Sequence, residues 1–436
     1  MDETGSCAAA TPTVRPPVAQ MIALTPVGIA VGALCALGLW GVSALAELVQ
    51  KLVWDDLSAA LGVSGDNGWF IFGTLTAVGL LAGLVIRYLP GHAGPDPATE
   101  GLVSTPLEIR VLPGLVLATV LTLSGGVSLG PENPIMAINA AIIVGLGVRL
   151  VPKLGQKEWM GLSTSATIGA MFGTPVAAAL MLSELNSGDP RVPLWHRLYV
   201  PLVAAATGSF VMLHFTDLGL SMGLPDETIG GVVHVLLAIG VAAAAATVGV
   251  VGAALFDPLH RLLNTRLPGP VVQLTVAGAV LGGLGALGGT ITLFKGLEQM
   301  NELPGEVATT TAMGFFVFAA VKLCALLVAG ASGFRGGRIF PAVFIGAAFG
   351  FGVHTLWTSI PLTLCVSASV VGISVAAARN GWLSLFLGLA IVPQMDLMVP
   401  LLFSTLAAWL VVANAPELSA RPVEIRRGSQ NAERNV

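Results

Sequence analysis

Long runs of apolar residues alternate with short polar connections along most of the chain. Four of these runs contain no Asp, Glu, Lys or Arg over at least the roughly twenty residues that a helix needs to cross a bilayer: residues 232–255, 271–293, 339–378 and 397–416. The pattern predicts an all-α protein that crosses the membrane many times. Glycine and proline occur throughout the apolar runs, which is typical of closely packed, broken and re-entrant helices.

Composition excludes a soluble protein. Of 436 residues, 55% are hydrophobic and only 10% are charged, whereas a soluble chain has about 25% charged residues. The four cysteines show no CxxC spacing, the six histidines form no HExxH motif, and there is no Walker A motif or nucleophile elbow. We therefore expect a transport protein in a lipid bilayer, with no cofactor, no metal, no nucleic-acid partner and no enzymatic activity.

Charged residues in the connections predict how the chain lies in the membrane. One set of connections and the C-terminal tail are basic, and the alternating set, around residues 55–66 and 217–227, is acidic or neutral. Basic connections lie on the cytoplasmic side. We expect a multi-pass protein of the plasma membrane with both termini in the cytoplasm. The basic residues are Arg87, Arg110, Arg149, Lys153, Lys157, Arg261, Arg266, Arg421, Arg426, Arg427 and Arg434.

An internal repeat links two glycine-rich segments. Residues 126–145 align with residues 333–352 at a constant offset of 207, and seven of the twenty positions are identical. The identical pairs include Gly126 with Gly333, Gly130 with Gly337, and Pro134 with Pro341. Transporters are often built from two such halves, with the ion site where broken helices from both halves meet. We expect GPENP and GRIFP to lie close together, in halves of about 21–215 and 230–416 between tails at 1–20 and 417–436.

Glu132 is the main candidate for function. It is the only charged residue between Arg110 and Arg149. A lone carboxylate in an apolar membrane stretch costs free energy, so its presence indicates a functional role. The surrounding glycines and Pro134 favour a helix that begins at this point, whose free N–H groups would attract either the carboxylate or an anion. Competition between the two for one site would form a gate. A helix cap facing a loop is the alternative.

The second copy of the repeat carries no acid and instead offers Arg335 and Arg338 with backbone amides, a pattern that predicts an anion cradle. Cytoplasmic anchoring is an equally good interpretation of Arg335.

Two further acids are candidates for a structural role or for a place on a proton path. Glu184 closes an apolar stretch and could brace neighbouring backbone, and Asp96 lies in a Pro/Gly-rich break that is typical of a surface turn.

Three segments resemble the CLC family of chloride channels and chloride/proton exchangers. Residues 110–134 (RVLPGLVLATVLTLSGGVSLGPENP) resemble the family segment that ends in GREGP, FGTPVAAALMLSEL resembles FNAPLAGxLFxxEE, and GGRIFP resembles GGIFAP. They occur in the family's order, and the likeness is closest to short bacterial members without CBS domains. The resemblance implies an inverted-repeat helical fold, a homodimer and one anion pathway per subunit.

The resemblance also assigns roles to individual positions. Glu132 falls on the gating glutamate, and Glu184 falls on the first acid of the EE pair. The positions that flank the gate or hold the anion through backbone amides are Gly130, Asn133, Pro134, Gly337, Arg338, Ile339 and Phe340.

Several family features are replaced in this chain. Pro131 stands in place of the motif's arginine, and Leu185 stands in place of the second acid, which takes up cytoplasmic protons in exchangers. GPDPA, from residue 94, is the rough counterpart of the family's serine motif but contains no serine. Tyr88 and Tyr199 are poorly placed for the central tyrosine. We therefore do not expect proton coupling by the family's usual route.

These observations predict a chloride or other small-anion channel or transporter gated by Glu132. An alternative is a secondary transporter of another ion, such as fluoride, a cation or an organic acid, because Asp96, Glu132 and Glu184 could together bind a cation. A membrane scaffold or sensor without transport is a third class, and it predicts no ion flux.

Overall fold

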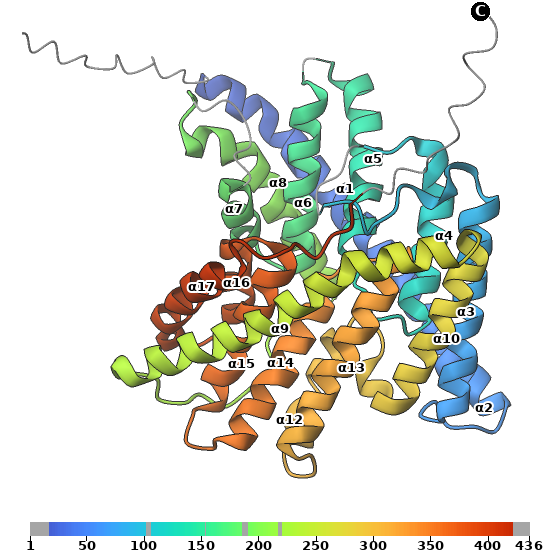
Figure 1. Cartoon of the computed structure of the whole chain (residues 1–436). Coiled ribbons are helices and arrows are strands. Elements are labelled where there is room, and N and C mark those ends of the chain that lie inside the picture. Colours follow the sequence, from blue (N-terminus) through green and yellow to red (C-terminus); the bar gives the residue numbers. More distant parts are fainter. Residues whose placement is uncertain (1–16, 102–105, 153, 185–190, 217–219, 422–436) are drawn as a thin grey trace, which may run out of the picture.

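The computed structural model describes residues 17–101, 106–152, 154–184, 191–216 and 220–421. Within them the chain is helical, and its only β-type pairing is one isolated bridge (Figure 1). The larger helices are α1 (Val18–Lys51), α3 (Gly68–Tyr88), α4 (Leu112–Ser124), α5 (Glu132–Leu150), α6 (Gln156–Phe172), α7 (Pro175–Glu184), α8 (Leu194–Phe215), α9 (Gly231–Arg266), α10 (Gly269–Gly288), α13 (Ala312–Ala331), α14 (Ile339–Leu356), α15 (Leu362–Ala378), α16 (Gly381–Ile391) and α17 (Met398–Val412). Shorter helices are α2 (Ser58–Ala60), α11 (Leu297–Met300) and α12 (Leu303–Glu306).

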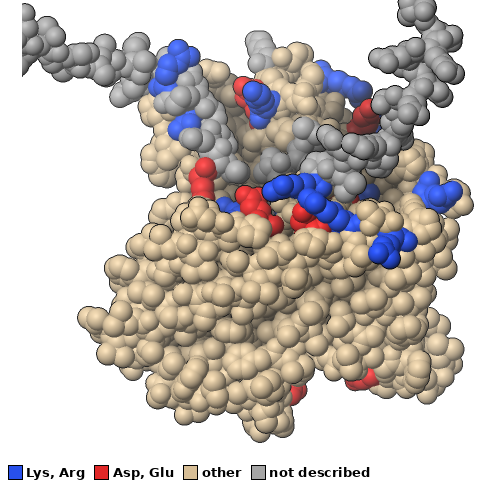
Figure 2. Space-filling view, viewed as in Figure 1, with Lys and Arg blue, Asp and Glu red and all other residues tan. Residues whose placement is uncertain are grey.

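The surface has the character of a membrane protein. Nine helices among the described residues are long and apolar enough to span a bilayer, and four further apolar helices are shorter. Figure 2 shows a broad uncharged band, with Lys and Arg gathered at the end where α1 begins and a few acidic residues at the opposite end. Many large apolar side chains, such as Phe210 and Leu236, are exposed. Such a continuous apolar surface fits lipid and not water.

Small residues bring helices into close contact. A methyl group added at Gly79 of α3 would lie 2.2 Å from the Leu274 carbonyl oxygen of α10, and one added at Gly278 of α10 would lie 2.3 Å from the Leu75 carbonyl oxygen of α3. Backbones can approach this closely only where no side chain intervenes. In the centre of the molecule, α14 packs between α13 and α15, and nearly all of its residues are buried.

The two copies of the repeat adopt the same backbone course. In each, a helix (α4 or α13) ends, a glycine with positive φ follows, and a new helix (α5 or α14) begins after a short extended stretch. The positive-φ glycines are Gly126, at 87°, and Gly333, at 90°, and these two positions are paired in the sequence repeat. A left-handed residue just after a helix favours glycine. From their adjacent starting points, α5 and α14 run toward opposite ends of the molecule (Figure 1).

The packed chain extends beyond the predicted domain limits of 21 and 416. Helix α1 begins at Val18, and the segment 417–421 folds back onto the helices, with Leu418 and Ala420 buried. The Ala420 amide donates to the Ala98 carbonyl at 2.7 Å. Directly before this segment, the Arg379 guanidinium donates to three carbonyl oxygens, those of Val412, Ala415 and Pro416. The sequence pattern could not reveal these backbone contacts.

Candidate functional site

The two repeat turns pair directly with each other. The Gly130 amide donates to the Gly337 carbonyl at 2.8 Å, and the Gly337 amide donates to the Gly130 carbonyl at 2.6 Å, which forms an antiparallel bridge. A methyl group at Gly336 would lie 2.4 Å from Leu129 Cβ, so the turns meet without room for side chains. The predicted proximity of GPENP and GRIFP is confirmed. Because the amide of each glycine donates to the carbonyl oxygen of the other, neither amide is free to hold an anion.

Glu132 is completely buried at the first residue of α5 and points toward α14. Its Oε1 atom accepts a hydrogen bond of 2.6 Å from the Phe340 amide, which is in the first turn of α14. Its Oε2 atom has no hydrogen-bond partner among the described residues. A carboxylate at this place is favoured by the free N–H groups and the positive end of the α14 dipole. The predicted position of Glu132 at a helix N-terminus is confirmed.

The space around the carboxylate depends on glycine. A methyl group at Gly337 would lie 1.9 Å from Glu132 Oε2, and one at Gly130 would lie 2.3 Å from the same atom. Gly337 does not have positive φ, so alanine is compatible with its backbone. Gly130 and Gly337 are therefore needed because a larger side chain would clash with Glu132, and not because the backbone requires positive φ.

This geometry gives a double-mutant prediction. Gly337→Ala should displace the Glu132 side chain and destabilise the protein by about 1–3 kcal/mol through overpacking. In a Glu132→Ala background most of this cost should disappear, because the clashing carboxyl group is absent. Unfolding of all four proteins in mixed detergent micelles measures the coupling, and equal costs in both backgrounds would contradict the geometry.

Two cavities flank the site on the side of the Pro/Gly-rich loop 93–101. The first is lined by that loop together with Asn133, Pro134 and Arg335. The second is lined by Asn133, Gly337 and Arg338 among others, and Leu418 closes part of it. Together they connect the loop with the residue that directly follows Glu132.

Arg338 supplies a positive charge beside the gate candidate. Its Nη2 donates to the Glu100 carbonyl at 3.2 Å, and its charge lies within electrostatic reach of Glu132 and Glu417. It occupies the N-cap position of α14, directly before Ile339. An anion in the second cavity would therefore meet both the guanidinium and the α14 N-terminus.

Arg335 has a different environment. Its buried guanidinium donates to the carbonyl oxygens of His92, Ala93, Gly94 and Gly333 at 2.8–3.2 Å. These bonds fix the 92–94 turn, in which His92 and Ala93 have positive φ, against the repeat turn. Bonds to carbonyls occupy its donors, so Arg335 acts mainly as a structural clamp at the wall of the first cavity.

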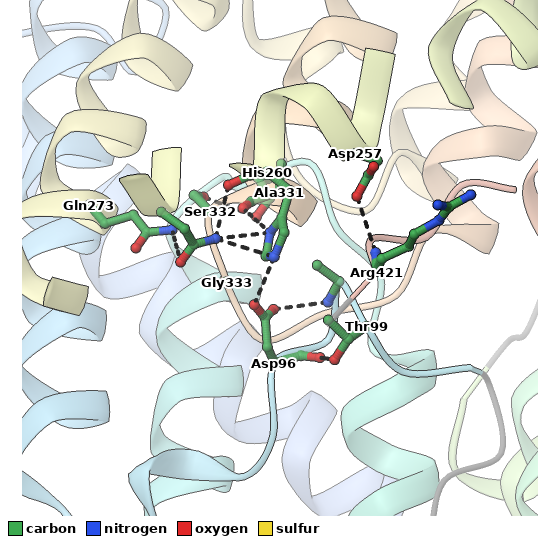
Figure 3. A network of polar contacts seen from close by, with 12 residues as sticks. Asp96, Thr99, Asp257, His260, Gln273, Ala331, Ser332, Gly333 and Arg421 are labelled. Carbon is green, nitrogen blue, oxygen red and sulfur yellow. Dashed lines mark hydrogen bonds and ion pairs between the residues drawn. The ribbon is translucent and has the colours of Figure 1, made fainter. Parts of the chain in front are cut away.

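The two other acids do not join Glu132. The exposed Glu184, at the end of α7, accepts from the Gly381 and Trp382 amides at 3.4 Å and so caps α16. Asp96 accepts from the Ala98 amide and faces His260 of α9 (Figure 3). Each acid thus has its own partners. Leu185, which stands in place of the family's second acid, lies outside the described residues.

Sequence reasoning missed Lys322. It is fully buried in α13, and its ammonium donates to the Thr292, Leu293 and Phe294 carbonyls at 3.0, 2.5 and 2.7 Å. The Phe294 amide in turn donates to the Gly126 carbonyl at 3.1 Å, which links this loop to the turn before Glu132. The available signal was that Lys322 is the only charged residue in residues 307–334.

Comparison with known proteins defines the class. Residues 78–413 match the family described as voltage gated chloride channel. The chain therefore belongs to this family, the CLC family, whose members are anion channels and transporters.

Curated relatives and solved structures agree with this assignment. The ion-transport proteins YfeO of Salmonella schwarzengrund and Salmonella paratyphi A are both 44% identical to this chain over 406 residues, covering 93% of this chain and 98% of each relative. A CLC-type fluoride/proton antiporter superposes with a TM-score of 0.75 at 17% identity, covering 93% of this chain and all of that one. A slow cyanobacterial Cl⁻/H⁺ antiporter gives 0.71 at 16%, covering 91% and 95%. The predicted helical CLC-like fold is confirmed.

Proposed function

We propose that this chain is a transport protein, not an enzyme, and that it moves a small inorganic anion between the N-termini of α5 and α14 under the control of Glu132. The observation that carries the proposal is the 2.6 Å bond from the Phe340 amide to the fully buried Glu132 carboxylate. The carboxylate occupies a position that would suit a permeant anion, because backbone donors and a helix dipole face it. Protonation or displacement of Glu132 would open that position.

The surroundings support an anion over a cation. Arg338 adds a positive charge beside Glu132, while Asp96 and Glu184 have their own partners. A dehydrated cation would need several convergent oxygen ligands. No group of three or more His, Cys, Asp or Glu side chains that could hold a metal ion occurs in the described part of the chain.

Ion flux from proteoliposomes tests the function. We expect efflux of at least one of chloride, nitrate and fluoride, and no efflux of sodium or potassium, from vesicles that contain the purified protein. The comparison of the three anions identifies the preferred ion, which includes the fluoride alternative. Cation efflux that disappears in Glu132→Gln would overturn the anion proposal, and absence of any flux would favour a scaffold.

Orientation and assembly complete the proposal. We propose that the end of the molecule at which Lys and Arg gather (Figure 2) faces the cytoplasm and that the protein lies in the plasma membrane. We also propose that both termini are cytoplasmic. We also propose a homodimer with one pathway in each subunit, as the family implies. The mass of the protein in detergent micelles checks the assembly.

A further inference from the structure

An open groove lies between the segment 106–110 and the second half of α5. The segment contributes Leu107 and Ile109 to its lining, and α5 contributes Ala141, Val144 and Gly145. The two sides lie close together, because a methyl group added at Gly145 would be 3.3 Å from Ile109 Cδ1. Ile109 is a large apolar residue, yet it is 50% exposed. The groove is therefore mainly apolar and has no side chain of the described residues covering it.

Positive charge gathers along the same groove, which Arg110 and Arg149 both line. Arg149 is exposed in the last turn of α5, and its side chain has no ion pair or hydrogen bond with any other residue that the structure describes. Arg110 Nε lies 2.6 Å from Glu108 Oε2, but these two side chains are 73% and 69% exposed. Such an exposed pair is weak. With two arginines and one glutamate, the lining has a net charge of +1.

The groove lies where the apolar surface meets the basic end of the molecule. Helix α5 runs from the buried gate candidate to the end of the molecule (Figure 1) at which Lys and Arg gather (Figure 2). Leu146, Val148 and Leu150, next to Arg149 in the sequence, are exposed. Large apolar side chains stay exposed in a membrane protein where lipid covers them. An arginine among them, at the end of a spanning helix, is typical of the headgroup region.

A phospholipid with a net negative charge matches both parts of the groove. Guanidinium groups bind phosphate oxygens through charge-assisted hydrogen bonds, and basic pockets between membrane helices bind anionic headgroups. An inorganic anion would use only the arginines, whereas an acyl chain would also cover Leu107, Ile109 and Val144. In a zwitterionic lipid, the amine of the headgroup cancels the phosphate charge. The net charge of the groove therefore favours an anionic lipid.

We propose that this groove binds one anionic phospholipid, with its phosphate at Arg110 and Arg149 and the first part of an acyl chain along the apolar lining. The lipid site does not depend on which ion the protein moves. Leu107 lines both the groove and the first cavity, which also reaches Asn133. A bound lipid therefore contacts one wall of the anion pathway, a consequence that rests on the proposed transport function.

Native mass spectrometry of the full-length protein in detergent tests the charged part of the site. Phosphatidylglycerol should bind at least about fivefold more tightly than phosphatidylcholine with the same acyl chains, and Arg149→Gln should remove about fivefold of this affinity. Glu108→Gln should tighten binding, because it frees Arg110. The matched control is Arg266→Gln, which removes an exposed arginine from the last turn of α9, outside the groove, and should change the affinity less than about twofold. Equal affinities for the two lipids, or equal losses from the two arginine substitutions, would overturn the proposal.

The same measurement distinguishes a lipid from a free anion. Ile109→Asn leaves the charges in place but makes the wall polar, so it should weaken phosphatidylglycerol binding by about threefold. A large excess of inorganic phosphate should not displace the lipid. Unchanged lipid affinity in Ile109→Asn, or displacement by phosphate, would refute the lipid site. The substituted residues are exposed, so the variants should fold. Binding is measured without transport, and its failure would leave the flux experiment as a separate test of the proposed function.

Discussion

Replacement of Glu132 with alanine is expected to tighten anion binding by about ten- to a hundredfold. The carboxylate accepts a charge-assisted hydrogen bond from the Phe340 amide, a type of bond that contributes about 1.5–3 kcal/mol, and an anion must replace it. Without the side chain, the amide and the α14 N-terminus are free for the anion. Calorimetric titration of the purified protein with chloride and fluoride measures the change.

The control for this prediction is Glu158→Ala. Glu158 is an exposed acid in the first turn of α6, so its loss should leave the affinity within about twofold, as expected of a surface charge screened by water and salt. Weaker anion binding in Glu132→Ala than in the unsubstituted protein would show that the carboxylate helps to hold the ion and does not compete with it.

Lys322→Met should give a large loss of stability. Methionine fills a similar volume, but it leaves the Thr292, Leu293 and Phe294 carbonyls without their donor. At about 1 kcal/mol or more for each buried carbonyl left unsatisfied, the free energy of unfolding should fall by at least about 3 kcal/mol. Contact between the ammonium and the Phe344 ring, 5.1 Å from its centroid, is lost as well.

Unfolding in mixed detergent micelles measures this effect, with Lys295→Met as the control. Lys295 pairs with Glu298 near the surface at 2.8 Å, and such pairs contribute at most about 1 kcal/mol. Equal losses from the two substitutions would mean that Lys322 is not the anchor of the loop.

The sequence alone predicted that Glu132 lies at a helix N-terminus because its signals are local and strong. Glu132 is the single charge in a long apolar stretch, and the glycines and prolines around it recur at a fixed offset. Where the backbone turns sharply or packs closely against another helix, glycine and proline are strongly favoured. The recurrence of these residues therefore made the repeat visible in the sequence. The same signals predicted that the two turns would meet.

Contacts made by backbone carbonyls left no comparable signal. Any residue can present a carbonyl oxygen, so nothing in the sequence showed that Arg335 would bind the 92–94 turn or that Arg379 would bind the carbonyls of residues 412, 415 and 416. The Asp96–His260 contact was hidden for a different reason: it joins two halves of the chain that show no shared pattern at these positions.

The opposed course of α5 and α14 has a consequence for the direction of flow. Because the two helices begin at the same place and run to opposite ends of the molecule, their positive ends point toward one another across the bridge between Gly130 and Gly337. In the proposed pathway, an ion arriving from either face would therefore meet a comparable field at the midpoint. These two helices alone would then give the pathway no preferred direction.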